Sequence, residues 1–179
     1  MHASSINMTA LIAEEIFTRL LEQHGGIIRK VALGYANSYA DRQDLAQEIT
    51  LQLWRAYPRY SPERPFSTWM YRIAMNVAIS FLRRQAHPAR QTLSIEENEM
   101  ELAEEMRDDE ADDRVTLLRR VIGSLPPLER GLLLLYLDDH SYREIAAVLG
   151  LTETNVATKL SRLKNRVRDK ILQLNQQNA

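Results

Sequence analysis

Near the C-terminus, residues 153–174 carry polar and basic side chains along one face of a helical pattern. Arginine and lysine can bind phosphates or the edges of guanine, and serine, threonine and asparagine can contact bases or backbone. This face therefore suits binding to duplex nucleic acid. The alternative is a solvated basic face on an ordinary bundle helix. The candidate contacts on this face are Asn155, Thr158, Lys159, Ser161 and Arg162.

A second polar stripe follows one side of residues 67–85. An indole ring can stack on an unpaired base while arginines hold phosphates, so this stripe suits single-stranded nucleic acid. The alternative is a buried tryptophan with arginines that only keep the surface soluble. Its members are Trp69, Arg72, Asn76, Ser80 and Arg83, whereas the apolar positions that we expect to face inward are Met70, Ile73, Ala74, Val77, Ala78, Phe81 and Leu82.

The C-terminal face must be held by a helix-turn-helix. The pattern predicts a short helix over 142–149, a turn at 150–152 and a long helix over 153–174. Ala146 is small where the two helices touch, Gly150 permits positive φ in the turn, and Val156 anchors the second helix. Thr152 is expected to cap that helix and to leave free amides suited to a phosphate.

Upstream helices are predicted over residues 9–24, 27–40, 44–56 and 67–85. Gly25 and Gly26 are expected to end the first of them, and Ser67 or Thr68 to cap the last. Three prolines between residues 58 and 65 predict a stiff loop, and His87 with Pro88 closes this part. Leu45, Ile49 and Leu53 should be buried on one face. Because no segment alternates like a strand, we predict an all-α fold.

Charge divides the chain into three parts. The formal net charge is −1, but residues 96–113 contain eleven acidic residues and one basic residue. The flanking parts are mildly basic, with net charges of +4 over residues 1–95 and +5 over 114–179. We therefore predict two small helical domains, 1–90 and 114–179, joined by an acidic linker at 91–113. The sequence leaves open whether the two domains pack on one another.

Several classes of protein are disfavoured by the composition. The chain has no cysteine, so disulfides and thiolate metal sites are excluded within it. No stretch has the roughly 20 apolar residues that span a bilayer, and no secretion signal is evident, which predicts a cytoplasmic protein without membrane insertion. No phosphate loop or catalytic triad is found, so we predict no enzyme, no metal and no cofactor. The histidines lack ligand spacing: His2, His24, His87 and His140.

Together these segments resemble the extracytoplasmic-function group of bacterial RNA polymerase sigma factors, which retain only conserved regions two and four. Residues 44–48 with Trp54, residues 60–66 and residues 68–76 resemble region two. Residues 125–130 and 141–146 resemble the entry into region four. The resemblance covers roughly residues 15–86 and 114–172, which is most of the chain.

The resemblance implies a role for each candidate residue. Asp44, Gln47, Glu48 and Trp54 would lie in the helix that docks on core RNA polymerase. The loop that contains Tyr60, together with the Trp69 stripe, would capture and read bases of the melted minus-ten element. The face from Asn155 to Arg162 would read the minus-thirty-five element of promoter DNA. The protein would direct promoter recognition and strand opening, and an anti-sigma factor would hold it inactive.

Three positions depart from the family pattern. Ser80 stands where the family usually has aspartate, Ala157 where it usually has a basic residue, and Lys159 where arginine is more usual. Because lysine lacks the two-pronged guanidinium, the promoter preference should differ from that of other members. The acidic linker is expected to thread through the positively charged channel of the polymerase.

Two other classes of function remain open on the sequence. One is a polymerase-independent helix-turn-helix regulator whose N-terminal part senses a ligand or forms a dimer. It explains Ala146, Gly150 and Val156 equally well but leaves the helix of Trp54 and the Trp69 stripe unexplained. The other is an enzyme or an adaptor that sequesters polymerase, and no catalytic motif supports it.

Overall fold

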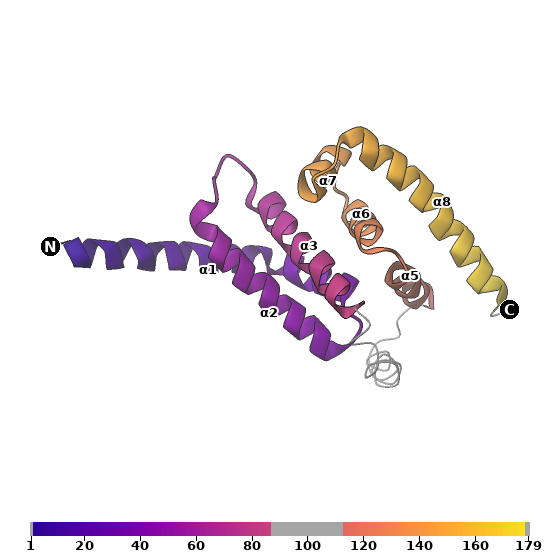
Figure 1. Cartoon of the computed structure of the whole chain (residues 1–179), viewed down its shortest axis with the longest axis horizontal. Helices are drawn as coiled ribbons and strands as arrows, with labels where there is room; N and C mark the ends of the chain where they lie inside the picture. The colour runs from indigo at the N-terminus through magenta and orange to yellow at the C-terminus, as the bar shows by residue number, and fades with distance from the viewer. Residues whose placement is uncertain (1, 87–112, 178–179) are drawn as a thin grey trace.

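Every regular element in residues 2–86 and 113–177, the part of the chain that the computed structural model describes, is a helix. The first group of helices is α1 (His2–Tyr35), α2 (Tyr39–Ala56), the short 3-10 helix η1 (Tyr57–Arg59) and α3 (Phe66–Gln85). The second group is α5 (Asp113–Gly123), α6 (Pro127–Leu137), α7 (Tyr142–Leu149) and α8 (Glu153–Gln177). The predicted all-α class is confirmed (Figure 1).

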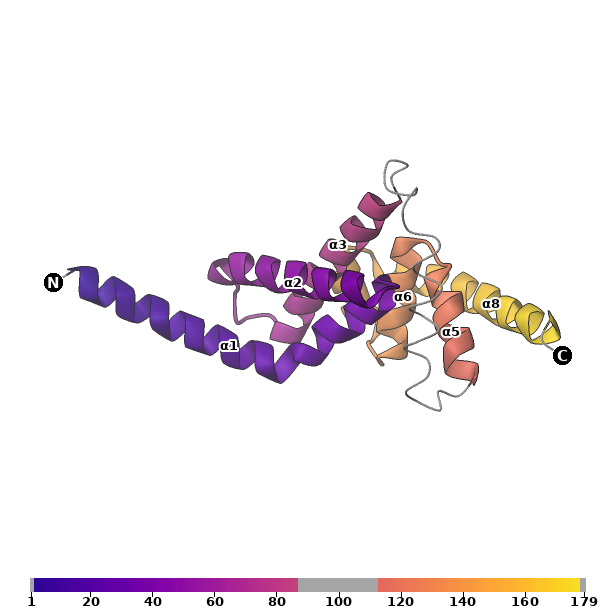
Figure 2. The ribbon, with the colours of Figure 1, turned by 90° about the horizontal axis from the view of Figure 1, so that it is seen from below.

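Helix α1 differs from the prediction, because it runs unbroken through Gly25 and Gly26. The predicted end at residue 24 and the separate helix over 27–40 are both wrong. Each glycine inside a helix costs about 1 kcal/mol. Burial of Phe17, Ile27 and Val31 offsets this, since a fully buried side chain of this size contributes roughly 1.5–3 kcal/mol. Figure 2 shows α1 bending along its length, which a pair of glycines accommodates.

Helix α2 begins at Tyr39, earlier than the predicted start at Asp44. The cap is Ser38, whose hydroxyl accepts a hydrogen bond from the Asp41 amide at 3.0 Å. A serine in this position was available as a signal and was missed. The predicted apolar face is confirmed, because Leu45, Ile49 and Leu53 are completely buried.

Helix α3 is not capped by Ser67 or Thr68, as the sequence predicts. It begins at Phe66, and its N-cap is Pro65, which provides no side-chain hydrogen bond. The Trp69 amide donates to the Pro65 carbonyl at 3.2 Å, so the stiff loop leads directly into the first turn. The inward face is as predicted: Met70, Ala74 and Ala78 are buried, and half-buried against the same core are Ile73, Val77, Phe81 and Leu82.

The helix-turn-helix is confirmed. Helix α7 covers 142–149 and α8 begins at residue 153, as predicted. Gly150 has φ 68°, and the amides of Gly150 and Leu151 both donate to the Ala146 carbonyl. Ala146 and Val156 are buried where α7 and α8 meet.

Gly150→Ala should destabilise the protein by about 1 kcal/mol, because an L side chain is strained at this positive φ. No atom lies within 4 Å of the position that the new Cβ would take, so strain is the whole effect. The measurement is urea unfolding followed by circular dichroism. Gly123→Ala is the control, since its Cβ also meets open space and its φ is not positive. Equal stability of the two variants would contradict the prediction.

The two groups of helices pack together and share one continuous core. One side of α3 contacts α1 and α2, and the other contacts α6 and α7. Tyr71 and Met75 lie on this second side and are only 4% and 1% exposed. Figure 1 shows α6 and α7 between α3 and α8, so α8 lies on the outer side of the second group.

Two sequence predictions fall on residues outside the described ranges. The acidic linker predicted at 91–113 lies almost entirely in residues 87–112, and so does the predicted break at His87 and Pro88. Among the helices that are described, none combines the length and hydropathy needed to span a lipid bilayer.

Candidate nucleic-acid interface

The predicted face of the long C-terminal helix is open to solvent. All five candidate contacts on α8 are exposed, and the turn between α7 and α8 holds the start of the face in place. The Asn155 amide donates to the Thr152 hydroxyl at 3.2 Å, which confirms Thr152 as the cap. The Thr158 hydroxyl donates to the Thr154 carbonyl at 2.9 Å, so within the helix it is already engaged. The exposed members are Asn155, Thr158, Lys159, Ser161 and Arg162.

The basic side chains of α8 differ in their contacts. Arg168 pairs with Asp169 of the same helix, and Lys170 donates to the Ser124 hydroxyl. Arg166 pairs with Glu129 of α6, and Lys164 lies over the Tyr136 ring with 4.8 Å between its Nζ and the ring centroid. Both therefore hold α8 on α6. Lys159 and Arg162 form no ion pair within the described residues. The structure thus selects Lys159 and Arg162 as the cations that remain available to an anion.

The polar stripe of α3 is also exposed. Arg72, Asn76, Ser80 and Arg83 all lie at the surface along one side of the helix, as predicted. Trp69, the first member of the stripe, is only half-exposed and packs against the core. The stripe is therefore a line of guanidinium, amide and hydroxyl groups that starts at an indole.

An aromatic cluster supports Trp69 and the loop before it. The Tyr60 ring lies 5.1 Å from Trp69 and 5.4 Å from Phe66, centroid to centroid. The Tyr60 hydroxyl donates to the Arg64 carbonyl at 2.9 Å, which closes the loop on itself. These contacts fasten the proline-rich loop to the start of α3. Tyr60 thus organises the loop, in addition to any contact with a ligand.

The four candidates on α2 are not equivalent. Asp44 and Gln47 are exposed, and Trp54 is 44% exposed with its ring packed edge-on against Phe17 at 5.1 Å. Glu48 accepts a hydrogen bond from Arg84 of α3 at 2.6 Å, so part of its role is to join two helices. Leu51, which the sequence analysis does not name, is a fifth exposed or partly exposed side chain of α2 near these candidates.

Leu51 is 46% exposed, four residues after Gln47 and three before Trp54, which places it on the same helical face. Its position at helical spacing from the candidates was the signal that could have identified it. Leu51 and Trp54 form a small exposed apolar area with polar neighbours, which is the usual composition of a protein-binding surface.

The described helices thus present two separate polar faces, one on a helix-turn-helix and the other beside an indole. Two family models match the chain: Sigma-70 region 2 over residues 20–87 and Sigma-70 region 4 over residues 116–167. The chain belongs to the sigma-70 family, in the extracytoplasmic-function (ECF) group of RNA polymerase sigma factors. The resemblance described from the sequence is therefore confirmed.

The relatives agree with this assignment. The ECF RNA polymerase sigma factor SigE of Mycolicibacterium smegmatis is 28% identical over 84% of this chain, but the chain spans only 59% of that protein. It spans 41% of the probable RNA polymerase sigma factor RfaY of Xanthomonas campestris, at 26% identity over 89% of this chain. The ECF RNA polymerase sigma-E factor of Escherichia coli K12 is 28% identical over 88% of this chain and 87% of its own.

Solved structures share the fold. The structure of CnrH in complex with the cytosolic domain of CnrY covers 93% of this chain and 91% of its own, with a TM-score of 0.60 and 24% identity. The sigma factor RpoE from Bartonella quintana, in complex with the anti-sigma factor NepR, covers 88% of this chain and 97% of its own, with a TM-score of 0.68 and 16% identity.

Proposed function

We propose that this chain binds core RNA polymerase, recognises two promoter elements and promotes strand opening for transcription initiation. The observation that carries the proposal is that two polar faces are exposed on helices belonging to sigma-70 regions 2 and 4. These faces lie on α3 and α8. Each is formed from residue types that bind bases and phosphates.

Core polymerase would dock on α2. The proposed contacts are Asp44, Gln47, Glu48 and Trp54, and we add Leu51 as an apolar contact beside Trp54. Because Glu48 also pairs with Arg84, its replacement would disturb the join between α2 and α3 as well as the docking surface.

The melted minus-ten element would bind α3 and the loop before it. Trp69 would stack on an unpaired base, and arginines on the stripe would hold phosphates. A loop held in one shape loses less entropy when it captures a flipped base. The proposed contacts are Tyr60, Trp69, Arg72, Asn76, Ser80 and Arg83.

The minus-thirty-five element would bind α8 in its major groove. Lys159 and Arg162 are the proposed base or phosphate contacts, because they are exposed and make no ion pair within the described ranges. Asn155, Thr158 and Ser161 would add polar contacts on either side.

We further propose that residues 1–90 form the region 2 domain, 91–113 an acidic linker through the polymerase channel, and 114–179 the region 4 domain. The protein would contribute binding energy and geometry and no catalysis. Its place of action would be the cytoplasm, where polymerase meets the genome.

An anti-sigma factor is the proposed regulator. RpoE from Bartonella quintana has its anti-sigma factor bound, and CnrH has the cytosolic domain of CnrY bound. In this chain large apolar side chains lie exposed in both groups of helices and would serve as anchors for such a partner. They include Ile16, Leu33, Leu137 and Tyr142.

The test combines polymerase binding with transcription. Purified bacterial core polymerase is mixed with the protein and sheared bacterial genomic DNA, and the 5′ ends of new transcripts are sequenced. We expect the protein to comigrate with core polymerase and to generate transcript starts that share two upstream sequence elements. Failure to bind core, together with tight binding of a specific duplex by the protein alone, would favour the polymerase-independent regulator instead.

A further inference from the structure

Phe17 is an aromatic residue of α1 that packs against the C-terminal end of α2. It is 3% exposed, whereas Ile16 beside it is 48% exposed. The Phe17 ring lies edge-on to Trp54, with 5.1 Å between the centroids, and 4.8 Å from the Tyr57 ring. The match to Sigma-70 region 2 begins at residue 20. This contact is therefore made by a residue outside the segment that the family model matches.

Tyr57 joins α2 to the loop that precedes α3. Its amide donates to the carbonyls of Leu53 and Trp54, which ends α2, and its carbonyl accepts a hydrogen bond of 2.9 Å from the Tyr60 amide. We call residues 57–66 the capture loop. Because its first residue is bonded to the last turn of α2, the position of the Tyr57 ring affects the direction in which the loop leaves that helix.

Aromatic contacts continue from Tyr57 through the capture loop to α3. The Tyr57 ring stacks on Tyr60 with 6.2 Å between the centroids and 17° between the planes, and Tyr60 lies 5.1 Å from Trp69. Phe66 is 7% exposed and lies 5.2 Å from Trp69. Aromatic pairs at these separations stabilise one another beyond the area that they bury. We call the rings of Phe17, Tyr57, Tyr60, Phe66 and Trp69 the aromatic row.

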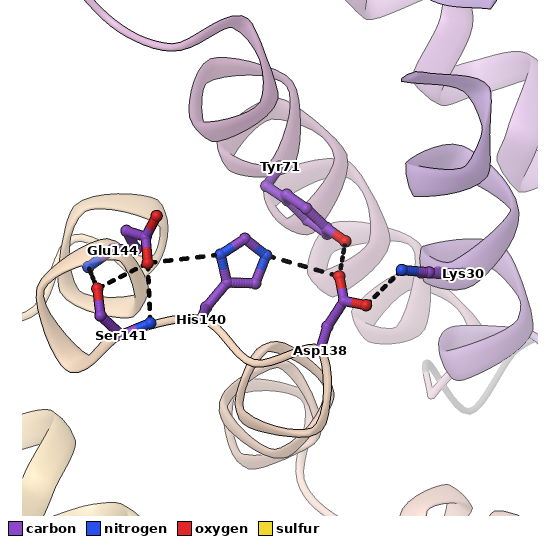
Figure 3. A network of polar contacts seen from close by, with 6 residues as sticks. All are labelled: Lys30, Tyr71, Asp138, His140, Ser141 and Glu144. Atoms are coloured by element: carbon purple, nitrogen blue, oxygen red, sulfur yellow. Dashed lines mark hydrogen bonds and ion pairs between the residues drawn. The ribbon is translucent and has the colours of Figure 1, made fainter. Parts of the chain in front are cut away.

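Other parts of α1 and α3 make a different contact. Lys30 of α1 pairs with Asp138 of α6, and the Tyr71 hydroxyl of α3 donates to the same carboxylate at 2.5 Å (Figure 3). The Tyr71 ring lies edge-on to His140 at 4.8 Å, so this tyrosine faces region 4 although it follows Trp69 by two residues. The aromatic row belongs to region 2, and its members can be replaced without removing a group from this contact.

We propose that Phe17 and Tyr57 are positioning residues that hold the capture loop and Trp69 in the arrangement that receives unpaired bases of the minus-ten strand. This inference rests on the proposed function, and it assigns the two residues an effect through Tyr60 and Trp69 rather than a contact with DNA. A loop that is already in place loses less conformational freedom when a base binds. Because Phe17 also lies against Trp54, it supports the surface proposed to dock on polymerase as well.

The position of the loop is tested first in the full chain without polymerase. Tyr57→Leu replaces the ring by an aliphatic side chain, and Tyr57→Phe keeps the ring. The Tyr60 and Arg64 amides donate to carbonyls within the capture loop. Their hydrogen exchange should be roughly fivefold faster in Tyr57→Leu and unchanged in Tyr57→Phe. Equal exchange in Tyr57→Leu and the wild type would overturn the proposal.

Base capture is measured with the complete holoenzyme. The probe is fork DNA from a promoter located by the transcript mapping, with its minus-ten strand unpaired, and a second fork carries abasic sites in place of the unpaired bases. A variant that is only less well folded weakens binding to both forks equally, so the ratio of the two affinities reports the base contacts. Tyr57→Leu and Phe17→Leu should each reduce this ratio roughly fivefold, and Tyr57→Phe should retain it.

The fork comparison separates this inference from the proposed function. An unchanged ratio in both leucine variants would overturn the inference and leave the proposed function intact. If the wild-type holoenzyme itself does not prefer the fork with intact bases, the proposed base capture fails and the inference fails with it.

Binding to core polymerase distinguishes the two positioning residues. Phe17→Leu should weaken core binding roughly threefold, because the ring supports Trp54, whereas Tyr57→Leu should leave core binding unchanged. Phe81→Leu is the matched control, since it removes a half-buried ring from α3 about 18 Å along the helix from Trp69. The control should retain both core binding and the fork ratio. If it reduces the ratio as much as Phe17→Leu does, a specific role of the aromatic row is excluded.

Discussion

Replacement of both Lys159 and Arg162 by alanine is expected to weaken promoter binding by the polymerase-bound protein by about 2–4 kcal/mol, which is about 30- to 800-fold. Both side chains are exposed on the face of α8 that follows the turn. Each would contact a base edge or a phosphate, and neither has a partner to satisfy it within the described residues. The loss should appear as reduced open-complex formation at limiting concentration.

The same helix supplies a matched control. Lys164→Ala with Arg166→Ala removes the same number of charges, but these side chains hold α8 on Tyr136 and Glu129. Exposed contacts of this kind contribute at most about 1 kcal/mol to folding stability, so the double variant should stay folded. Because these two side chains are engaged within the protein, promoter affinity should also change little. An equal loss of affinity in the two double variants would show that bulk charge, rather than this face, determines binding.

Salt dependence distinguishes the kinds of contact on this face. If a cation contacts phosphate, its removal should reduce the slope of log affinity against log salt by about one. If it reads a base, the variant should instead lose discrimination between promoter sequences. The measurement is a salt titration of the polymerase-bound protein on matched and altered minus-thirty-five sequences.

Arg130→Met is expected to lower the free energy of unfolding by about 3 kcal/mol. Arg130 is 5% exposed, and its guanidinium donates to carbonyls at the ends of two helices, Gly34 in α1 and Gly123 in α5. Burial lowers the pKa of Arg130, but an arginine remains charged, and its positive charge favours helix C-termini. Methionine fills a similar volume and leaves these carbonyls without a donor.

The control for this variant is Arg120→Met, because Arg120 is an exposed arginine on α5. Its replacement should change stability by less than about 0.5 kcal/mol. Urea unfolding followed by circular dichroism measures both. If Arg130→Met is as stable as the control, the guanidinium does not stabilise the ends of α1 and α5. Packing around Tyr35 would then account for the contact between these helices and α6.

The helix-turn-helix could be predicted residue by residue, because its determinants are local. A small residue at Ala146, positive φ at Gly150 and an apolar anchor at Val156 act within one corner of the chain. The exposure of the α3 stripe is also local, since residues three and four apart share a face of any helix.

Predictions failed where contact with a helix distant in the sequence outweighed the local preference of the residues. The glycine pair in α1 weakens a helix locally, yet the helix continues because its apolar face is buried on α2 and α3. Glu48 reads as a solvated side chain until Arg84 of another helix is placed beside it. Tyr71 and Met75 extend the apolar face of α3 around to a second side, against which the region 4 helices α6 and α7 pack.

By itself, the amino-acid sequence determined the helical class, the corner that presents α8, the two polar faces and the family. Only the tertiary structure decided that regions 2 and 4 pack together, which cations of α8 remain available, and that Asp138 lies between Lys30 and Tyr71. The reason is separation along the chain. The partners in these contacts are up to 108 residues apart, and no periodicity within one helix specifies which distant surface it will meet.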